Sequence, residues 1–436
     1  MIRKAEVLVV GAGPAGIAAA TAAARHGCQV LLLDDNASAG GQIWRSGATT
    51  RGKRDAAKMS ALANLRSSGA ETLMGRRIID APQRGVLRAA IENSTTSAVE
   101  SYEWDHLVIA TGARERFLPF PGWTLPGVFG AGGLQALVKG GFDVKGKRIV
   151  IAGTGPLLLA VAAHLKEYGA TVVCVVEQAP WRQLLPFTAS LWSQPARLFQ
   201  GARYRIALRG IPYRHGCWPT AALGEDALRS LRITDGRRTW EERCDLLACG
   251  FHLVPNTELP ALLDCTFEGD FIRVDAQQRT SIENIFCVGE PTGIAGLDAA
   301  LVQGEIAGLT IAGEAGKATT LQARRDRENS FGERLLSAFR LRPELQSLAT
   351  AETIVCRCED VRYDQLKAYP SWTEAKLQTR CGMGPCQGRI CGPAVQTLFG
   401  WHARSVRPPI FPVPLHLLCD ADPSYSHETT VPQEKL

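Results

Sequence analysis

The sequence predicts an α/β protein with two Rossmann-like dinucleotide-binding domains and a small helical C-terminal unit. Two observations lead to this prediction. A strand–glycine turn–helix–strand pattern occurs twice, in residues 5–34 and 148–177, and five of the 13 cysteines crowd into residues 356–391. The chain has 436 residues, which is too long for one hydrophobic core and agrees with about three units.

The first pattern has the order of one βαβ unit. Residues 5–10 are predicted to form a strand, residues 14–26 an alanine-rich helix, and residues 29–34 the next strand. An apolar stretch of this kind also resembles a signal peptide or a membrane span, but glycines interrupt it at a fixed spacing. We therefore expect neither a targeting segment nor an integral membrane span.

The turn between this strand and helix has the sequence Gly11-Ala-Gly13-Pro-Ala-Gly16. Gly11 permits a tight turn, Gly13 lets the backbone approach a pyrophosphate, and Gly16 allows close packing of helix and strand. Asp34 lies 23 residues after Gly11, where a carboxylate can accept hydrogen bonds from a ribose diol. The combination predicts a dinucleotide site, and a glycine turn that packs without a ligand is the alternative.

The second pattern, residues 148–177, is a weaker nucleotide motif. Gly153 and Gly155 are present, but Leu158 takes the place of the third glycine. Glu177 stands where an acid favours NAD over NADP. Two interpretations stay open: an NAD(P) site, and a retained fold without nicotinamide turnover.

Weaker signals complete the two domains. An irregular alternation in residues 72–104 predicts a small antiparallel region, and two short apolar runs, 106–112 and 284–289, predict strands that end on glycine. An Ala/Gly-rich run in residues 297–313 predicts a buried helix, and a Pro/Gly cluster in residues 119–127 marks a linker. We assign residues 1–120 and 256–316 to a discontinuous first domain and residues 121–255 to a second domain inserted into it. Residues 317–350 are assigned to a linker, and residues 351–436 to a C-terminal unit with its tail.

Composition and charge exclude other classes. The chain is 45% apolar and 21% charged, and its formal charge of +6 is spread along the sequence, so we expect no nucleic-acid-binding surface. No Ser/His/Asp, Cys/His or paired-carboxylate arrangement indicates a hydrolase, and the sequence assigns no catalytic residue.

Three further segments resemble the two-dinucleotide-binding flavoproteins of the pyridine-nucleotide-disulfide oxidoreductase type: Gly-Gly-Gln at 40–42, Ala-Thr-Gly at 110–112 and Cys-Val-Gly-Glu at 287–290. The resemblance covers residues 5–313 and implies FAD on the first domain. In that family a late strand ends in Gly-Asp and the acid meets the flavin ribityl chain; Glu290 matches it here. The FAD-binding residues implied are Gly11, Gly13, Pro14, Ala15, Gly16, Asp34, Asp35, Gly41, Gln42, Ala110, Thr111, Gly112, Gly289 and Glu290.

The cysteine-rich segment contains Cys356-Arg-Cys358 and, later, Cys381-Gly-Met-Gly-Pro-Cys386-Gln-Gly-Arg-Ile-Cys391. Soft thiolates at this density suit an iron–sulfur cluster or zinc, and their uneven distribution favours a reducing, cytoplasmic compartment. The segment is similar to the [2Fe-2S] domain related to bacterioferritin-associated ferredoxin, which implies Cys356, Cys358, Cys386 and Cys391 as ligands. Cys381 stays open as a fifth candidate, and zinc as the alternative metal.

With the Leu-Pro-Gly-Val-Phe-Gly-Ala-Gly-Gly segment from Leu125, these motifs resemble one subfamily over nearly the whole chain. It comprises the A subunits of opine (octopine and nopaline) oxidases, the B subunits of hydrogen cyanide synthases, and the α subunits of D-hydroxyproline dehydrogenases. The resemblance implies an electron-transfer subunit that takes electrons from a separate D-amino-acid-oxidase-like catalytic subunit and passes them to an acceptor. It also allows FMN at a subunit interface. A stand-alone NAD(P)H-dependent flavoprotein reductase and a non-catalytic scaffold are the alternatives.

Overall fold

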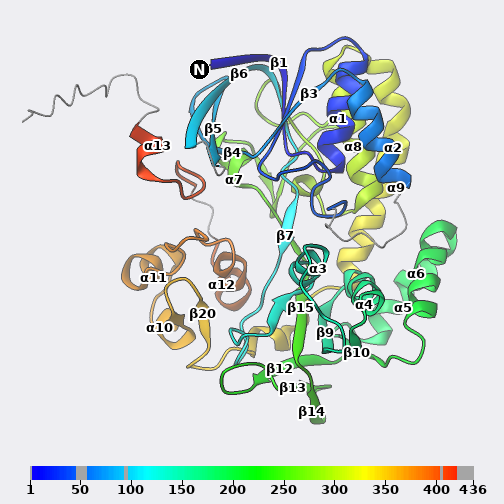
Figure 1. Ribbon diagram of the computed structural model, residues 1–436, viewed down its shortest axis with the longest axis vertical. Coiled ribbons are helices and arrows are strands. Elements are labelled where there is room, and N and C mark those ends of the chain that lie inside the picture. Colours follow the sequence, from blue (N-terminus) through cyan, green and yellow to red (C-terminus); the bar gives the residue numbers. More distant parts are fainter. Residues whose placement is uncertain (1, 46–55, 93–96, 403–405, 420–436) are drawn as a thin grey trace, which may run out of the picture.

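The computed structural model describes residues 2–45, 56–92, 97–402 and 406–419. The first domain is built on a seven-stranded sheet in the order β3-β2-β1-β6-β5-β4, with β19 paired to β6 (Figure 1). Strands β1, β2, β3 and β19 run parallel to their neighbours, whereas β4 and β5 are antiparallel. The strands span Ile2–Val10 (β1), Val30–Asp34 (β2), Glu71–Met74 (β3), Arg76–Gln83 (β4), Val86–Glu92 (β5), Ser97–Ile109 (β6) and Ile285–Cys287 (β19).

Two helices of the first domain pack unusually close together because glycine lines their contact. Helix α1 (Pro14–Arg25) meets α8 (Leu297–Ile311) where a methyl group at Gly304 would lie 2.1 Å from the Ala15 carbonyl oxygen. Helices α2 (Ala56–Ser67) and α9 (Ala315–Ala338) flank this pair. The Ala/Gly-rich run was predicted as a buried helix, and α8 confirms it.

The second domain has a parallel five-stranded sheet in the order β11-β10-β9-β15-β8. A separate antiparallel three-stranded sheet, β12-β13-β14, packs next to it at the bottom of Figure 1. The strands span Val128–Gly130 (β8), Arg148–Thr154 (β9), Thr171–Glu177 (β10), Tyr213–His215 (β11), Trp218–Leu223 (β12), Ser230–Thr234 (β13), Thr239–Arg243 (β14) and Leu246–Phe251 (β15). The helices are Ala131–Lys139 (α3), Leu157–Glu167 (α4), Trp181–Ser190 (α5), the 3-10 turn Leu191–Ser193 (η1) and Pro195–Ala207 (α6).

A two-stranded ribbon of β7 (Ala113–Glu115) and β16 (Leu253–Pro255) carries the chain between the two domains. Short elements follow β16 on the first domain: α7 (Glu258–Leu262), the hairpin β17 (Phe267–Glu268) and β18 (Phe271–Ile272), and the 3-10 turn η2 (Glu290–Thr292). The βαβ units therefore form as the sequence predicts, and the fold class is confirmed.

The C-terminal unit combines a small hairpin with three short helices. Its elements are β20 (Ile354–Cys356), β21 (Val361–Arg362), α10 (Tyr363–Lys367), α11 (Trp372–Thr379) and α12 (Cys391–Phe399). The 3-10 turn η3 (Pro343–Ser347) precedes the unit and packs on the second domain, and a last short helix, α13 (Leu415–Cys419), follows it. A separate apolar core, which includes Val355, Leu366 and Val395, holds the unit together.

Two predicted segments have more structure than the sequence suggested. The stretch named a linker, residues 317–350, contains most of α9 and all of η3. Its polar composition reflects a helix that buries only small residues such as Ala318 and Gly332 along one narrow stripe. In the tail of the C-terminal unit, the described residues pack on the first domain, since the Ile410 N–H donates to the Ile79 carbonyl at 2.8 Å. Residues 420–436 of the tail lie outside the described part.

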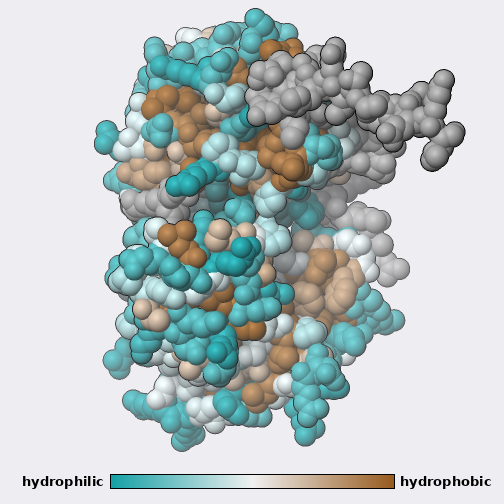
Figure 2. Space-filling model, turned by 90° about the vertical axis from the view of Figure 1, so that its left-hand side faces the viewer, coloured by the Kyte–Doolittle hydropathy of each residue, from teal (hydrophilic) through white to brown (hydrophobic). Residues whose placement is uncertain are grey.

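The surface offers no sign of a membrane-spanning element among the described residues: none of their helices is long and apolar enough to cross a bilayer. Figure 2, which turns the side with the C-terminal unit toward the viewer, shows hydrophobic residues in separate patches among hydrophilic ones.

Candidate functional site

The first glycine-rich turn has one open position between two crowded ones. A methyl group at Gly11 would lie 2.2 Å from the Ala110 carbonyl oxygen, and one at Gly16 would lie 1.8 Å from the Gly11 carbonyl oxygen. A methyl group at Gly13 would meet no protein atom within 4 Å. Gly11 and Gly16 are therefore fixed by packing, whereas Gly13 borders free space at the N-terminus of α1, where a pyrophosphate fits.

Asp34 holds this turn from the end of β2. Its carboxylate accepts hydrogen bonds from the Ala12 N–H at 2.6 Å and from the Asn36 N–H at 2.7 Å, and the residue is 8% exposed. A carboxylate has further lone pairs, so ribose hydroxyls can still be accepted there. The neighbouring Asp35 carboxylate oxygen Oδ2 lies 3.8 Å from Arg77 Nε. Burial, together with the charge of Asp34, raises the pKa of Asp35.

The other predicted FAD-binding residues meet at the same edge of the sheet. A methyl group at Gly41 would lie 2.9 Å from the Gly13 Cα, and one at Gly289 would lie 3.0 Å from the Ala15 Cβ. A methyl group at Gly112 would lie 3.8 Å from a carboxylate oxygen of Glu290. Pro14 begins α1, Thr111 follows Ala110 after β6, and Gln42 is exposed in the turn after Gly41. Burial raises the pKa of Glu290, partly offset by the Ala113 N–H. The structure thus brings the predicted residues together.

Sequence reasoning missed two residues that join this edge to the C-terminal unit, because no motif marks them. The Asn256 N–H donates to the Gly112 carbonyl at 2.9 Å, and its side-chain amide donates to the Thr111 carbonyl at 2.8 Å. Arg114 then donates through Nη1 to the Asn256 Oδ1 at 2.7 Å and through Nε to the Arg389 carbonyl at 3.1 Å.

The second glycine turn has a different environment. Glu177 is fully buried, and its carboxylate accepts hydrogen bonds from the Thr154 hydroxyl at 2.7 Å, the Gly155 N–H at 2.8 Å and the Ala179 N–H at 2.9 Å. Burial nevertheless raises its pKa to about 7. Unlike Asp34, which keeps some exposure, Glu177 is completely enclosed by the chain and is therefore a poor partner for a ribose.

The chain itself lies over this second turn. The Phe339 carbonyl, just after α9, is within hydrogen-bond distance of the Thr154 hydroxyl at 3.4 Å, the Gln178 amide at 3.4 Å and His252 Nε2 at 2.7 Å. These three side chains stand at the carboxyl ends of β9, β10 and β15, which is where α/β sheets bind nucleotides.

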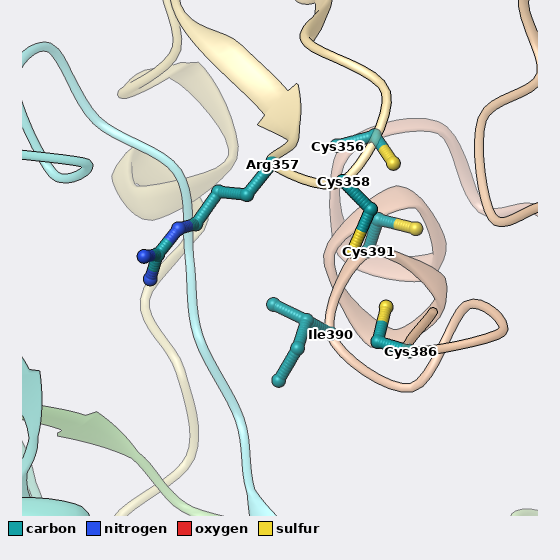
Figure 3. Close-up of a pocket in the computed structure, with 6 residues that line it drawn as sticks. All are labelled: Cys356, Arg357, Cys358, Cys386, Ile390 and Cys391. Atoms are coloured by element: carbon teal, nitrogen blue, oxygen red, sulfur yellow. The ribbon is translucent and has the colours of Figure 1, made fainter. Parts of the chain in front are cut away.

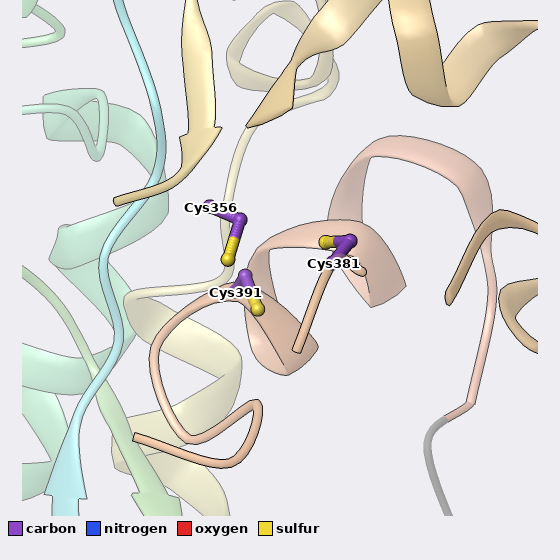
Figure 4. A group of neighbouring side chains, drawn as sticks. All are labelled: Cys356, Cys381 and Cys391. Carbon is purple, nitrogen blue, oxygen red and sulfur yellow. The ribbon is translucent and has the colours of Figure 1, made fainter. Parts of the chain in front are cut away.

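Five thiols converge in the C-terminal unit. Cys356, Cys358, Cys386 and Cys391 line one pocket of about 270 Å³ together with Ile390, and Arg357 points away from the sulfur atoms (Figure 3). The Sγ atoms of Cys356, Cys381 and Cys391 lie within 4.8 Å of one another (Figure 4). The four predicted ligands therefore face one space, and Cys381 adjoins two of them from its buried side.

Local backbone and electrostatics prepare these sulfurs for a metal. A methyl group at Gly384 would lie 2.3 Å from the Cys358 Cβ, so glycine there lets the two loops approach. Hydrogen bonds from the Cys381 and Cys391 thiols lower the pKa of Cys356 to about 2. Five cysteine sulfurs gathered at one place are the donor set that soft metal ions and iron–sulfur clusters require.

The fold and these residues define a flavoprotein oxidoreductase with two dinucleotide-binding domains. The chain belongs to the pyridine nucleotide-disulphide oxidoreductase family, whose model matches residues 5–316. It is similar to the A subunit of the opine oxidase of Rhizobium meliloti strain 1021, with 32% identity covering 95% of this chain and 98% of that protein. It is also similar to the HcnB subunit of the hydrogen cyanide synthase of Pseudomonas aeruginosa, with 31% identity covering 88% and 90%.

Among solved structures, the L-proline dehydrogenase of P. horikoshii has a similar fold. Its TM-score is 0.66 at 18% identity, and the match covers 96% of this chain and 80% of that one. The predicted resemblance to the opine oxidase and hydrogen cyanide synthase subunits is thereby confirmed.

Proposed function

We propose that this chain is the FAD- and iron–sulfur-containing electron-transfer subunit of a heteromeric, opine-type amine or amino-acid dehydrogenase or oxidase. Its catalytic partner is a D-amino-acid-oxidase-like subunit that oxidises a CH–NH donor. The names of the relatives, the A subunit of opine oxidase and the HcnB subunit of hydrogen cyanide synthase, support a role within a larger complex. The donor set of five cysteines supports a metal cluster.

The observation that carries this proposal is the chain of contacts between the two candidate cofactor sites. It runs from Thr111 and Gly112 through Asn256 and Arg114 to the Arg389 carbonyl. The Arg389 N–H in turn donates to the Cys386 carbonyl at 3.0 Å. Packed and hydrogen-bonded atoms thus connect the predicted flavin loop with a predicted cluster ligand.

The chain's residues have separate tasks in this proposal. FAD, when bound, accepts two electrons and releases them singly, which suits a cluster that carries one. Gly13 would leave room for the pyrophosphate at the N-terminus of α1, Asp34, which fixes the turn, would accept hydrogen bonds from the ribose, and Glu290, beside Gly112, would meet the ribityl chain. Cys356, Cys358, Cys386 and Cys391 would hold the cluster.

The test is to produce the chain together with a candidate D-amino-acid-oxidase-like subunit and to purify the complex anaerobically. We expect flavin and iron in the preparation, and adding a secondary-amine opine should bleach the flavin absorbance and give the electron paramagnetic resonance signal of a reduced [2Fe-2S] cluster. Iron-free protein, or a cluster that stays oxidised while the flavin bleaches, would contradict the proposal.

A further inference from the structure

Helix α6 presents an apolar stripe to solvent. None of its 13 residues is buried. Pro195, Phe199, Ala202 and Ile206 recur at intervals of four, three and four and are all exposed, with Phe199 at 67% and Ile206 at 73%. The opposite side, with Tyr204 near Leu208, is the one that packs on the core of the second domain. The described chain covers only the opposite side of α6, so its apolar stripe is open to a partner.

The neighbouring elements enlarge this apolar surface. Trp192 in η1 is 80% exposed, and Trp181 and Leu185 on α5 are 53% and 45% exposed. Tryptophan is among the side chains that contribute most to binding at protein interfaces, and phenylalanine is enriched there. Figure 1 shows α5 and α6 at the right-hand edge, on the side away from α10–α12.

The same segment carries charge of one sign. Between Glu177 and Glu225 the sequence has six arginines and no Asp or Glu. Arg197 is used internally, since it pairs with Glu328 and stacks over the Phe331 ring at 3.4 Å. Arg182, Arg203 and Arg209 are exposed around the stripe. A second copy of this chain would bring the same positive charge, so a different, acidic partner fits better.

We propose that Trp181, Trp192, Phe199 and Ile206 form the docking face for the catalytic partner subunit, which offers an apolar groove rimmed by carboxylates. This inference rests on the proposed function. The narrow stripe favours a protein groove over a lipid surface, because helix-in-groove contacts use single anchors at this spacing, whereas interfacial membrane helices carry a broad apolar face.

The test compares two charge-introducing variants in the co-produced complex. The double variant Phe199→Glu/Ile206→Glu alters the docking face, and Leu377→Glu alters a residue of α11 that is also exposed, at 69%. Losing two interface anchors of about 2 kcal/mol each should weaken binding to the partner roughly a thousandfold. Leu377→Glu should bind like the wild type, and both variants should keep flavin and iron.

Other outcomes would overturn the inference. Unchanged partner binding by the double variant would show that this face is not the interface. If the double variant binds the partner normally but no longer binds phosphatidylglycerol vesicles that the wild type binds, the face belongs to a membrane surface instead. If the wild-type chain itself does not associate with the catalytic partner, the proposed function fails first, and the docking face falls with it.

Discussion

Gly13 and Gly16 stand three residues apart in the first glycine turn, yet their surroundings differ completely. An alanine at position 13 fits the protein, whereas one at position 16 collides with the Gly11 carbonyl. We expect Gly13→Ala to fold normally and lose FAD affinity at least about tenfold, since the methyl group occupies the space for pyrophosphate. Gly16→Ala should instead lower the thermal unfolding temperature. Flavin content after dialysis and circular dichroism separate the two effects, and full flavin retention by Gly13→Ala would contradict the assignment.

The five cysteines allow a test at the same scale. If Cys356, Cys358, Cys386 and Cys391 are the ligands, Cys386→Ser should lose iron and Cys381→Ser should keep it. Cys381 is buried beside Cys356 and Cys391, so its replacement is structurally the more costly change. Iron analysis under anaerobic conditions measures both. Iron loss by Cys381→Ser with retention by Cys386→Ser would make Cys381 a ligand instead.

Glu177 predicts a pH effect on stability. Burial raises its pKa in the folded protein from the ordinary 4.5 to about 7. Between these values the folded state keeps the proton that the unfolded state has lost, so the free energy of unfolding falls as pH rises, by on the order of 3 kcal/mol. Chemical denaturation at pH 4.5 and pH 7.5 should show this fall in the wild type and not in Glu177→Gln. If the free energy of unfolding changes equally with pH in the wild type and in Glu177→Gln, Glu177 is not the cause of the fall.

At the scale of elements, the end of α9 lies over the edge of the second sheet where a nucleotide would bind. The Phe339 carbonyl lies over the carboxyl ends of β9, β10 and β15, and Glu177 is enclosed beneath. Because this carbonyl already contacts side chains at the edge where a dinucleotide would bind, we expect NADH and NADPH to leave the flavin oxidised in anaerobic titrations, whereas dithionite reduces it. Bleaching by either nucleotide within minutes would restore the reductase alternative.

The same element shows where sequence reasoning reaches its limit. Both βαβ units, α8 and the gathering of the glycine motifs could be predicted, since they depend on local periodicity and on turns that only glycine allows. Helix α9 could not, because its polar residues are typical of a linker as well as of an exposed helix. Asn256 and Arg114 could not be predicted either, because their role depends on contacts with residues that are distant in the sequence.

At the scale of the whole molecule, Arg114 links two units. Besides Asn256 and the Arg389 carbonyl, it contacts Glu258 at 2.9 Å, and its side chain is 23% exposed. We expect Arg114→Leu to retain flavin and iron but to loosen the loop before Cys391, because charge-assisted hydrogen bonds contribute about 1.5–3 kcal/mol. Hydrogen exchange in residues 384–391 should then accelerate about ten- to a hundredfold.

A control exists for this change on the first domain. Arg84 pairs with Glu283 at 3.4 Å and is 72% exposed, so Arg84→Leu should leave the exchange of that loop unchanged. Flavin-to-cluster electron transfer, followed by stopped-flow absorbance, should slow only in Arg114→Leu. Equal exchange in both variants would remove Arg114 from the connection between the units.

The path of the last described residues has one more consequence. After the C-terminal unit the chain returns to the first domain. The Ile410 N–H donates to the Ile79 carbonyl, the Arg389 side chain donates to the Ile410 carbonyl at 2.6 Å, and Leu417 is buried against Ile79 and Ala90. The unit is therefore tethered at both ends, by α9 and η3 on one side and by this return segment on the other. These two attachments hold the unit against the first and second domains, so we expect an electron acceptor to dock directly on the unit.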